Sequence, residues 1–232
     1  MKVILCGYQW AACEALRQLI TKKYRVYVYT HINKYFEPSL INLCKKNKIK
    51  YTTKKNSILN LPFNPDMICS IFYKYKVPQE VLNISKGKAL NLHPSLLPKY
   101  RGSSSSAWAI LNNEKFVGFT YHYMDSKFDN GRIILQKKIK MNNFDLNFTL
   151  FYRIMFESMK YFLTAIQNVK RKIKGKKQVG KFSYFFKGPP FKGKINSKWS
   201  LSKKERFIRS MIFPPRPPAT LNKRKIRRIE EL

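Results

Sequence analysis

Short apolar segments alternate with helical repeats along most of the chain. Runs of apolar residues, or apolar residues at every second position, predict strands at residues 3–6, 25–30, 67–72, 89–93, 116–124 and 133–141. Apolar residues spaced three or four apart predict helices at residues 11–22, 38–47, 78–83 and 107–112. Strands and helices in this order predict an α/β fold with a doubly wound, Rossmann-like sheet.

A longer helix is predicted at residues 146–168, with core positions at Phe148, Phe151, Met155, Met159, Phe162 and Ile166. The composition changes after it, because residues 169–232 carry 21 Lys or Arg and only 3 acidic residues. We therefore place the main domain at residues 1–168 and a basic, small α+β extension at 169–232. In the extension we expect a solvated linker at 170–177, strands at 182–186 and 195–199, a helix at 202–211 and an extended Pro-rich segment at 213–219.

Polar residues interrupt the strand predicted at residues 89–93. Alternation along the strand places Asn91 and His93 on the same face. Pro94 and Pro98 then turn the chain into a loop, so the pair lies at the carboxyl end of the strand. Ligands of open α/β sheets bind at such ends, so this pair is the first candidate for chemistry.

Two segments carry a family resemblance. Residues 91–102 read Asn-Leu-His-Pro-Ser-Leu-Leu-Pro-Lys-Tyr-Arg-Gly, and residues 127–131 read Lys-Phe-Asp-Asn-Gly. They resemble the folate-dependent formyltransferases, whose pattern is Asn-x-His-x-Ser-Leu-Leu-Pro-x-x-Arg-Gly, followed by a loop with Asp before Gly. The resemblance covers roughly residues 1–165 and implies Asn91, His93 and Asp129 as catalytic residues, 10-formyltetrahydrofolate as cosubstrate and no metal. The chain departs from the pattern at Asn130, often threonine in the family, and in the two residues at 127–128 before Asp129.

The three residue types also suit formyl transfer to an amine. A formyl oxygen gains negative charge during this reaction and needs a preorganised hydrogen-bond donor, which the Asn91 amide can provide. His93 can donate to the same oxygen or help move the amine proton, and Asp129 can fix the tautomer of the imidazole. The amine attacks the formyl carbon directly, so the serines at 103–106 are interpreted as loop and helix-cap residues and not as nucleophiles.

Further site residues are assigned around this centre. The resemblance implies that the segment after the strand at 67–72 lines a pterin pocket, although a purely structural loop is an equal alternative. The predicted cofactor-binding residues are Phe72, Tyr73, Lys74, Tyr75, Asp125 and Asn130. The predicted substrate-binding residues are Gln9, Trp10, Lys76, Ser95, Arg101, Tyr184 and Trp199, where the last two either stack on a nucleotide base or form a small core. His31 and His122 are interpreted as surface or strand histidines.

Features near both ends of the chain indicate which type of molecule accepts the formyl group. The first turn, residues 7–12, has one glycine and bulky side chains, so it lacks the phosphate cradle of glycinamide ribonucleotide formyltransferases. The 64 residues after position 168 are too few for the C-terminal barrel of the tRNA-modifying members. The resemblance is greatest to the nucleotide-sugar N-formyltransferases. It implies an acceptor such as dTDP-4-amino-4,6-dideoxyglucose, used for surface polysaccharide such as O-antigen, and leaves open which base and whether the C3 or C4 amine is used.

The net charge of +35 keeps two alternatives open: a methionyl-tRNA formyltransferase and a catalytically silent basic binding module. Lysines occur along the whole chain together with many Asn and Ile residues, so we favour a solvated surface and do not expect a nucleic-acid partner. The apolar residues at 211–213 suggest a homodimer. The four cysteines are scattered along the chain, which predicts buried, reduced thiols. No apolar run reaches 18 residues, so we expect no membrane span. The apolar N-terminus is too short for a signal peptide, and with the reduced thiols it predicts a cytoplasmic protein.

Overall fold

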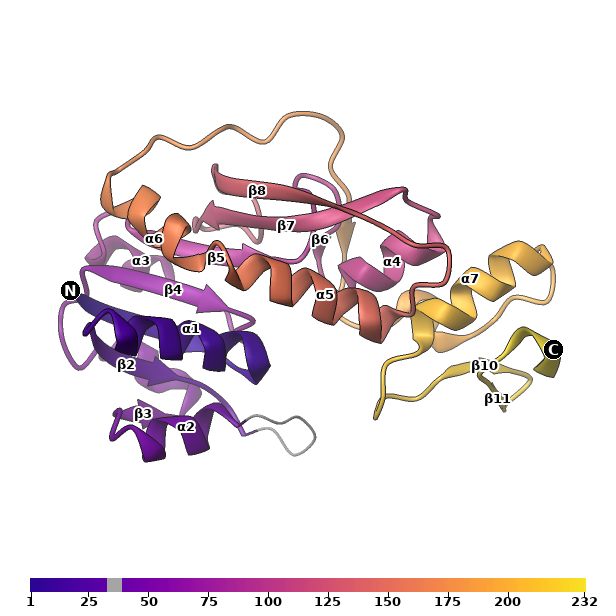
Figure 1. Cartoon of the computed structure of the whole chain (residues 1–232), viewed down its shortest axis with the longest axis horizontal. Coiled ribbons are helices and arrows are strands. Elements are labelled where there is room, and N and C mark those ends of the chain that lie inside the picture. The colour runs from indigo at the N-terminus through magenta and orange to yellow at the C-terminus, as the bar shows by residue number, and fades with distance from the viewer. Residues whose placement is uncertain (33–38) are drawn as a thin grey trace. The chain divides into compact units, whose positions relative to one another are not determined.

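A seven-stranded sheet forms the centre of the fold in the computed structural model, which describes residues 1–32 and 39–232 (Figure 1). Its strands, in spatial order, are β3 (Tyr51–Thr52), β2 (Arg25–Tyr29), β1 (Lys2–Gly7), β4 (Met67–Ile71), β5 (Ala89–His93), β7 (Phe116–Tyr123) and β8 (Ile133–Lys140). The first five are parallel, and β7 runs antiparallel to β5. The strand order reverses between β1 and β4, which confirms the predicted doubly wound, Rossmann-like sheet.

Helices cover this sheet. They are α1 (Gln9–Thr21), α2 (Leu40–Lys46), α3 (Gln79–Ile84), α5 (Asn147–Met159) and α6 (Phe162–Lys170), with a 3₁₀ turn η1 (Lys55–Leu59). Ile4 and Cys6 of β1 pack in one apolar cluster with residues of η1 and α3. Helix α1 lies against β1, β2 and β4, and α6 lies against β5. The residue at 38, the predicted start of the second helix, lies outside the described residues.

The helix predicted at residues 146–168 is two helices. The break follows Met159, whose carbonyl oxygen accepts a hydrogen bond from Gln18 Nε2 at 3.1 Å, while the carbonyl oxygen of Ser158 accepts from the Tyr121 hydroxyl at 2.9 Å. These carbonyl groups are satisfied by distant side chains, so the helix can end there. Phe148 was predicted as a core residue but is 38% exposed.

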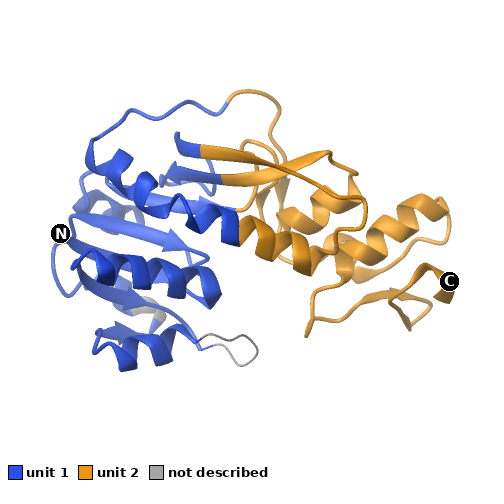
Figure 2. Cartoon of the chain, viewed as in Figure 1, with its two compact units in different colours: residues 1–93, 120–135, 156–178 blue, residues 94–119, 136–155, 179–232 orange. Residues whose placement is uncertain are grey.

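Two compact units divide the chain (Figure 2). Unit 1 comprises residues 1–93, 120–135 and 156–178, and unit 2 comprises residues 94–119, 136–155 and 179–232. Residues 169–178 thus cluster with unit 1 and the rest of the predicted extension with unit 2. The boundary at residue 168 stays a prediction about the extent of the catalytic domain.

Unit 2 has its own apolar core. Its elements are β6 (Arg101–Gly102), α4 (Ser105–Leu111), β9 (Tyr184–Phe185), η2 (Pro190–Gly193), α7 (Leu201–Met211), β10 (Ala219–Leu221), β11 (Arg224–Ile226) and η3 (Ile229–Glu231), with parts of β7, β8 and α5. Phe207 and Ile208 of α7 pack there with Leu111 of α4 and with residues of β10 and β11. Ser200 caps α7, because its Oγ accepts a hydrogen bond from the Lys203 amide.

Three expectations for the C-terminal part need correction. No strand occupies residues 195–199, where a turn is closed by the hydrogen bond from the Trp199 amide to the Asn196 carbonyl oxygen. The Pro-rich segment at 213–219 contains a turn, in which the Arg216 amide donates to the Phe213 carbonyl oxygen, so it is not extended throughout. Met211 and Phe213 are buried within unit 2, so they give no argument for a dimer, and the oligomeric state stays a prediction.

The segment predicted as a solvated linker, residues 170–177, is fixed in place by hydrogen bonds to its backbone. Carbonyl oxygens of this segment accept hydrogen bonds from the Tyr123 hydroxyl and the Arg132 guanidinium, and Lys176 forms a β-bridge with Ile133. Its lysine side chains are exposed, as expected. The charge pattern identified the solvated side chains but did not reveal that the backbone is paired.

The four cysteines are buried free thiols, as predicted. Burial, with a smaller contribution from Cys13, raises the pKa of the Cys44 thiol to about 12, so this thiol is neutral at physiological pH. Within the described residues, no helix is long and apolar enough to cross a membrane.

Candidate active site

Asn91, His93 and Asp129, the predicted catalytic residues, come together in unit 1. Asp129 lies in the loop after β7, and its carboxylate faces both residues of β5. One oxygen, Oδ2, lies 3.4 Å from His93 Nδ1, and the other, Oδ1, lies 3.4 Å from Asn91 Nδ2. His93 is 4% exposed and Asp129 is 9% exposed, so water does little to weaken their interaction.

The loop that carries Asp129 is held by hydrogen bonds at both ends. Asp125 accepts from the Lys127 amide at 2.9 Å and from Asn130 Nδ2 at 3.2 Å. Gln178 Nε2 donates to the backbone oxygens of Asp129 and Gly131, each at 2.9 Å. These contacts fix the position of the carboxylate, and the Gln178 contribution was not predicted from the sequence.

Gly131 completes the loop for a steric reason. A Cβ atom at this position would collide with the backbone carbonyl oxygen of Tyr123, the last residue of β7. The loop therefore returns along the end of β7 only if its residue 131 has no side chain. This close approach explains why a glycine follows Asp129 by two positions.

A fourth polar residue, His122, belongs to the same cluster. It lies opposite Asn91 in the antiparallel register of β5 and β7, and its Nε2 is 3.0 Å from Asn91 Nδ2. The same nitrogen is 3.4 Å from Asp129 Oδ1, and the residue is 2% exposed. His122 is a strand histidine, as interpreted from the sequence, but its contact with two predicted catalytic residues was missed.

Aromatic residues gather at the carboxyl ends of β1, β2 and β4, where the cofactor-binding residues were predicted. The rings of Tyr73 and Tyr75 meet edge to face at 5.5 Å, and His31 lies 4.2 Å from the ring of Tyr8. Burial, and secondarily the charge of Lys74, lowers the pKa of His31 and favours its neutral form. Phe72, the first residue of this segment, has a left-handed backbone with φ of 60°.

The predicted substrate-binding residues of unit 1, Gln9, Trp10 and Lys76, differ in their burial and contacts. Gln9 is only 7% exposed at the start of α1. Trp10 is half-buried and packs edge to face on Phe156 at 4.4 Å. The Lys76 ammonium lies 5.9 Å from the ring centre of Phe128 in the loop that carries Asp129. Lys76 therefore lies beside the loop that carries Asp129.

Two predicted substrate residues of unit 2 follow β5 in the chain, Ser95 in a loop and Arg101 in β6. Ser95 is buried, and its hydroxyl donates to the Lys99 carbonyl oxygen at 2.7 Å, which closes the turn after β5. The Arg101 guanidinium lies 5.2 Å from the ring centre of Phe182. The contact of Ser95 is structural, and its assignment to the substrate stays a prediction.

The two aromatic residues proposed for base stacking differ in exposure. Tyr184 is 40% exposed and contacts Phe186 edge to face at 5.3 Å. Trp199 packs edge to face on Phe207 at 5.2 Å, with the Lys203 ammonium 4.7 Å from its ring centre. Trp199 is thus part of the small core that was the alternative to stacking on a base, whereas Tyr184 presents an accessible ring.

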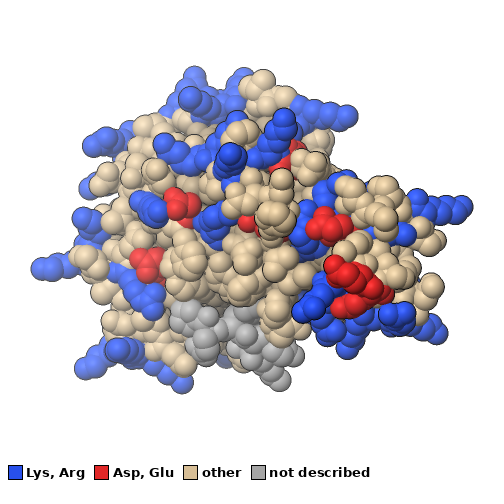
Figure 3. Space-filling model, turned by 45° about the vertical axis from the view of Figure 1, so that its right-hand side comes forward, with Lys and Arg blue, Asp and Glu red and all other residues tan. Residues whose placement is uncertain are grey.

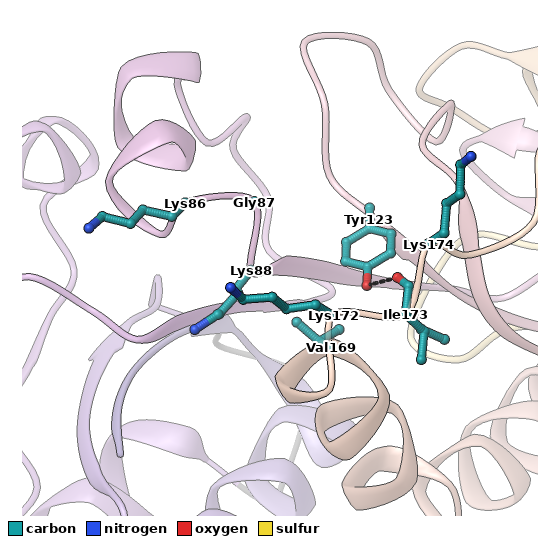
Figure 4. A pocket seen from close by; sticks show the side chains of 8 residues that line it. All are labelled: Lys86, Gly87, Lys88, Tyr123, Val169, Lys172, Ile173 and Lys174. Carbon is teal, nitrogen blue, oxygen red and sulfur yellow. Dashed lines mark hydrogen bonds between the residues drawn. The ribbon is translucent and has the colours of Figure 1, made fainter.

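A pocket of about 300 Å³ in unit 1 lies away from the cluster (Figure 4). It is at the amino end of β5, whereas His93 is at the carboxyl end. Its lining residues are Lys86, Gly87, Lys88, Tyr123, Val169, Lys172, Ile173 and Lys174. None of the predicted site residues lines it, and it offers no imidazole, carboxamide or carboxylate for formyl transfer.

The chain is similar to known proteins along most of its length. A family model described as formyl transferase matches residues 15–166. The GDP-perosamine N-formyltransferase of Brucella melitensis biotype 1 is 36% identical over 228 residues, covering 95% of this chain and 88% of that protein. The crystal structure of WlaRD, a sugar 3N-formyl transferase in the presence of dTDP and 5-N-formyl-THF, has a TM-score of 0.83 at 26% identity, covering 98% of this chain and 85% of that chain.

A second solved structure, the N-formyltransferase from Helicobacter canadensis in complex with folinic acid and dTDP-3-aminofucose, also has a TM-score of 0.83 at 26% identity. The match covers 98% of this chain and 86% of that one. The sequence motifs, the fold and these similarities agree along nearly the whole chain. The protein therefore belongs to the formyl transferase family.

Proposed function

We propose that this formyltransferase moves a formyl group from 10-formyltetrahydrofolate to the amine of a nucleotide-linked amino-dideoxy sugar. The proposal includes the cytoplasmic location expected from the sequence and a role in surface polysaccharide such as O-antigen. The observation that carries it is the buried contact of Asp129 with both Asn91 and His93. Two of the relatives named above have a nucleotide sugar in their name or as a bound ligand, and the third is a sugar 3N-formyl transferase solved with dTDP, which supports this acceptor class over the others.

Each of the three side chains has a separate role in the proposed reaction. Asn91 provides an N–H that donates to the formyl oxygen as that oxygen gains negative charge. His93 is held by Asp129 through Nδ1, and its other ring nitrogen donates to the same oxygen when it carries a proton or accepts the proton of the amine when it does not. Asp129 stabilises the imidazolium that forms when His93 takes a proton. No side-chain nucleophile is required, because the amine itself attacks the formyl carbon.

The residues around the cluster suit a folate. When bound, 10-formyltetrahydrofolate supplies the formyl group. The half-buried rings of Tyr73 and Tyr75, which meet edge to face, provide apolar contacts for a pterin, and Asp125 and Asn130 provide acceptors and donors for its edge. Lys74, near the ring of Tyr75, adds a positive charge suited to the carboxylates of the folate tail.

A panel of acceptors tests the proposal. Release of tetrahydrofolate is measured with dTDP-4-amino-4,6-dideoxyglucose, GDP-perosamine and dTDP-3-aminofucose, next to methionyl-tRNA and glycinamide ribonucleotide. We expect turnover with at least one nucleotide sugar and none with the last two acceptors. The first sugar is our specific candidate, and the other two identify the base and the amine position if it fails. A folded protein that uses only methionyl-tRNA would refute the proposed acceptor class.

The high positive charge makes tRNA the alternative that deserves a direct test. On the face shown in Figure 3, Lys and Arg side chains occur at many separate places and do not form one continuous patch. A binding site for a polyanion would instead concentrate them along one stripe. On this face the distribution supports a solvated surface, in agreement with the spread of lysines along the sequence.

Salt dependence separates the two acceptors. For a sugar acceptor we expect kcat/KM to change by less than about fivefold between 50 and 200 mM salt, because few charges are paired on binding. A tRNA acceptor that makes six to ten phosphate contacts would lose roughly a thousandfold or more in affinity over this range. Steep salt dependence of tRNA binding, unaffected by added folate, would favour the silent binding module.

A further inference from the structure

His122 has no role in the mechanism above, although its contact with Asn91, at 3.0 Å, is shorter than that of Asp129, at 3.4 Å. Its Nδ1 lies 2.7 Å from the carbonyl oxygen of Tyr123, and its Nε2 lies 3.0 Å from Asn91 Nδ2. The ring is 2% exposed, so neither contact competes freely with water. Both ring nitrogens therefore have defined partners.

His122 Nε2 is also 3.4 Å from Asp129 Oδ1, near the outer limit of a hydrogen bond, so the two shorter contacts determine the tautomer of the neutral ring. A carbonyl oxygen only accepts hydrogen bonds, so Nδ1 must carry the proton that it donates to Tyr123. Nε2 of neutral His122 is then an acceptor, and the group of Asn91 that faces it must be the NH₂ and not the carbonyl oxygen. His122 thus decides which way the Asn91 carboxamide points.

Asp129 completes this arrangement. Asn91 Nδ2 has two hydrogens, and its two acceptors are His122 Nε2 at 3.0 Å and Asp129 Oδ1 at 3.4 Å. The second distance is near the outer limit of a hydrogen bond, so the N–H on that side is the weakly held one. A formyl oxygen can accept this N–H in place of Asp129 Oδ1, while the bond to His122 keeps the carboxamide in place.

We propose that His122 is a positioning residue, which holds the Asn91 carboxamide with its NH₂ group ready to donate to the formyl oxygen. The proposal rests on the function proposed above for Asn91. Without the acceptor at Nε2, the carboxamide can rotate by half a turn and present its oxygen to the formyl oxygen. Two acceptors then face each other, and the charge that develops on the formyl oxygen is no longer stabilised.

Two substitutions at this position form a matched pair. His122→Asn retains a short amide that can donate to the Tyr123 carbonyl oxygen, but it leaves no acceptor at the place of Nε2. His122→Gln extends an amide oxygen to the place of Nε2, where it can accept from Asn91. We expect kcat of His122→Asn to fall about 10- to 100-fold, with KM and the Kd for folate within about threefold. His122→Gln should recover most of this loss.

The Asn91→Ala background shows whether His122 acts through Asn91. There, adding His122→Asn should change kcat by less than about twofold, because the side chain that it positions is absent. An equal loss in both backgrounds would overturn the proposal, as would wild-type kcat in folded His122→Asn. Melting temperatures of all variants are compared to exclude a folding defect.

A spectroscopic measurement is independent of the acceptor. In protein labelled with ¹⁵N-asparagine, the side-chain NH₂ signal that is lost in Asn91→Ala belongs to Asn91. This signal should shift in His122→Asn and return toward its original position in His122→Gln. An unchanged signal would contradict the contact even if no acceptor is found, whereas a shifted signal without turnover on any acceptor would count against the proposed function alone.

Discussion

Replacement of Asn91 by alanine is expected to lower kcat about 100- to 1,000-fold, which is the usual cost of losing one preorganised donor to a developing oxyanion. The side chain lies at the carboxyl end of β5, and its amide is held between His122 and Asp129. His93→Ala should fall at least as far. Asp129→Asn should resemble His93→Ala, because it removes the charge that stabilises the imidazolium.

Single-turnover kinetics and folate binding separate chemistry from affinity in these variants. The folate Kd should stay close to that of the wild type, since the loss concerns an interaction made in the transition state. Gln79→Ala is a suitable control, because its exposed side chain bonds to Asn83 on the surface of α3. Near wild-type turnover of His93→Ala would refute the mechanism.

Replacement of Phe207 by alanine is expected to lower the free energy of unfolding by about 3–5 kcal/mol, the usual cost of removing a buried phenylalanine. The side chain is fully buried in the core of unit 2, and the rings of Trp199 and Phe191 pack edge to face on it at 5.2 and 6.3 Å. A large cavity lined by these rings cannot close without moving α7. Urea unfolding followed by tryptophan fluorescence measures the change.

Leu201→Ala in the same helix is the matched control for Phe207→Ala. Leu201 is 68% exposed, so its truncation should change the free energy of unfolding by less than about 0.5 kcal/mol. Similar small changes in both variants would mean that unit 2 does not depend on this core. The Phe207 side chain would then not be a main stabilising element of α7.

The principal strands and the three catalytic candidates could be identified from the sequence because their signals are local. Strands β1, β4 and β5 are short, apolar and buried, and the predicted boundaries agree with the observed ones within about two residues. Alternation alone placed Asn91 and His93 on one face of β5. The short elements β3, β6, β10 and β11 have two or three residues each, too few for a periodic pattern, and they were not predicted as such.

The sequence by itself determined the α/β fold, the family and the three catalytic candidates, since each depends on residue types at fixed spacing in one or two segments. Only the tertiary structure decided what holds these candidates in place. His122 meets Asn91 across 31 residues through the register of β5 and β7, and Gln178 supports the Asp129 loop across 49 residues. Gln18 satisfies the end of α5 across 141 residues. Such hydrogen bonds depend on how distant segments are brought together, and no local pattern of apolar and polar positions encodes that pairing.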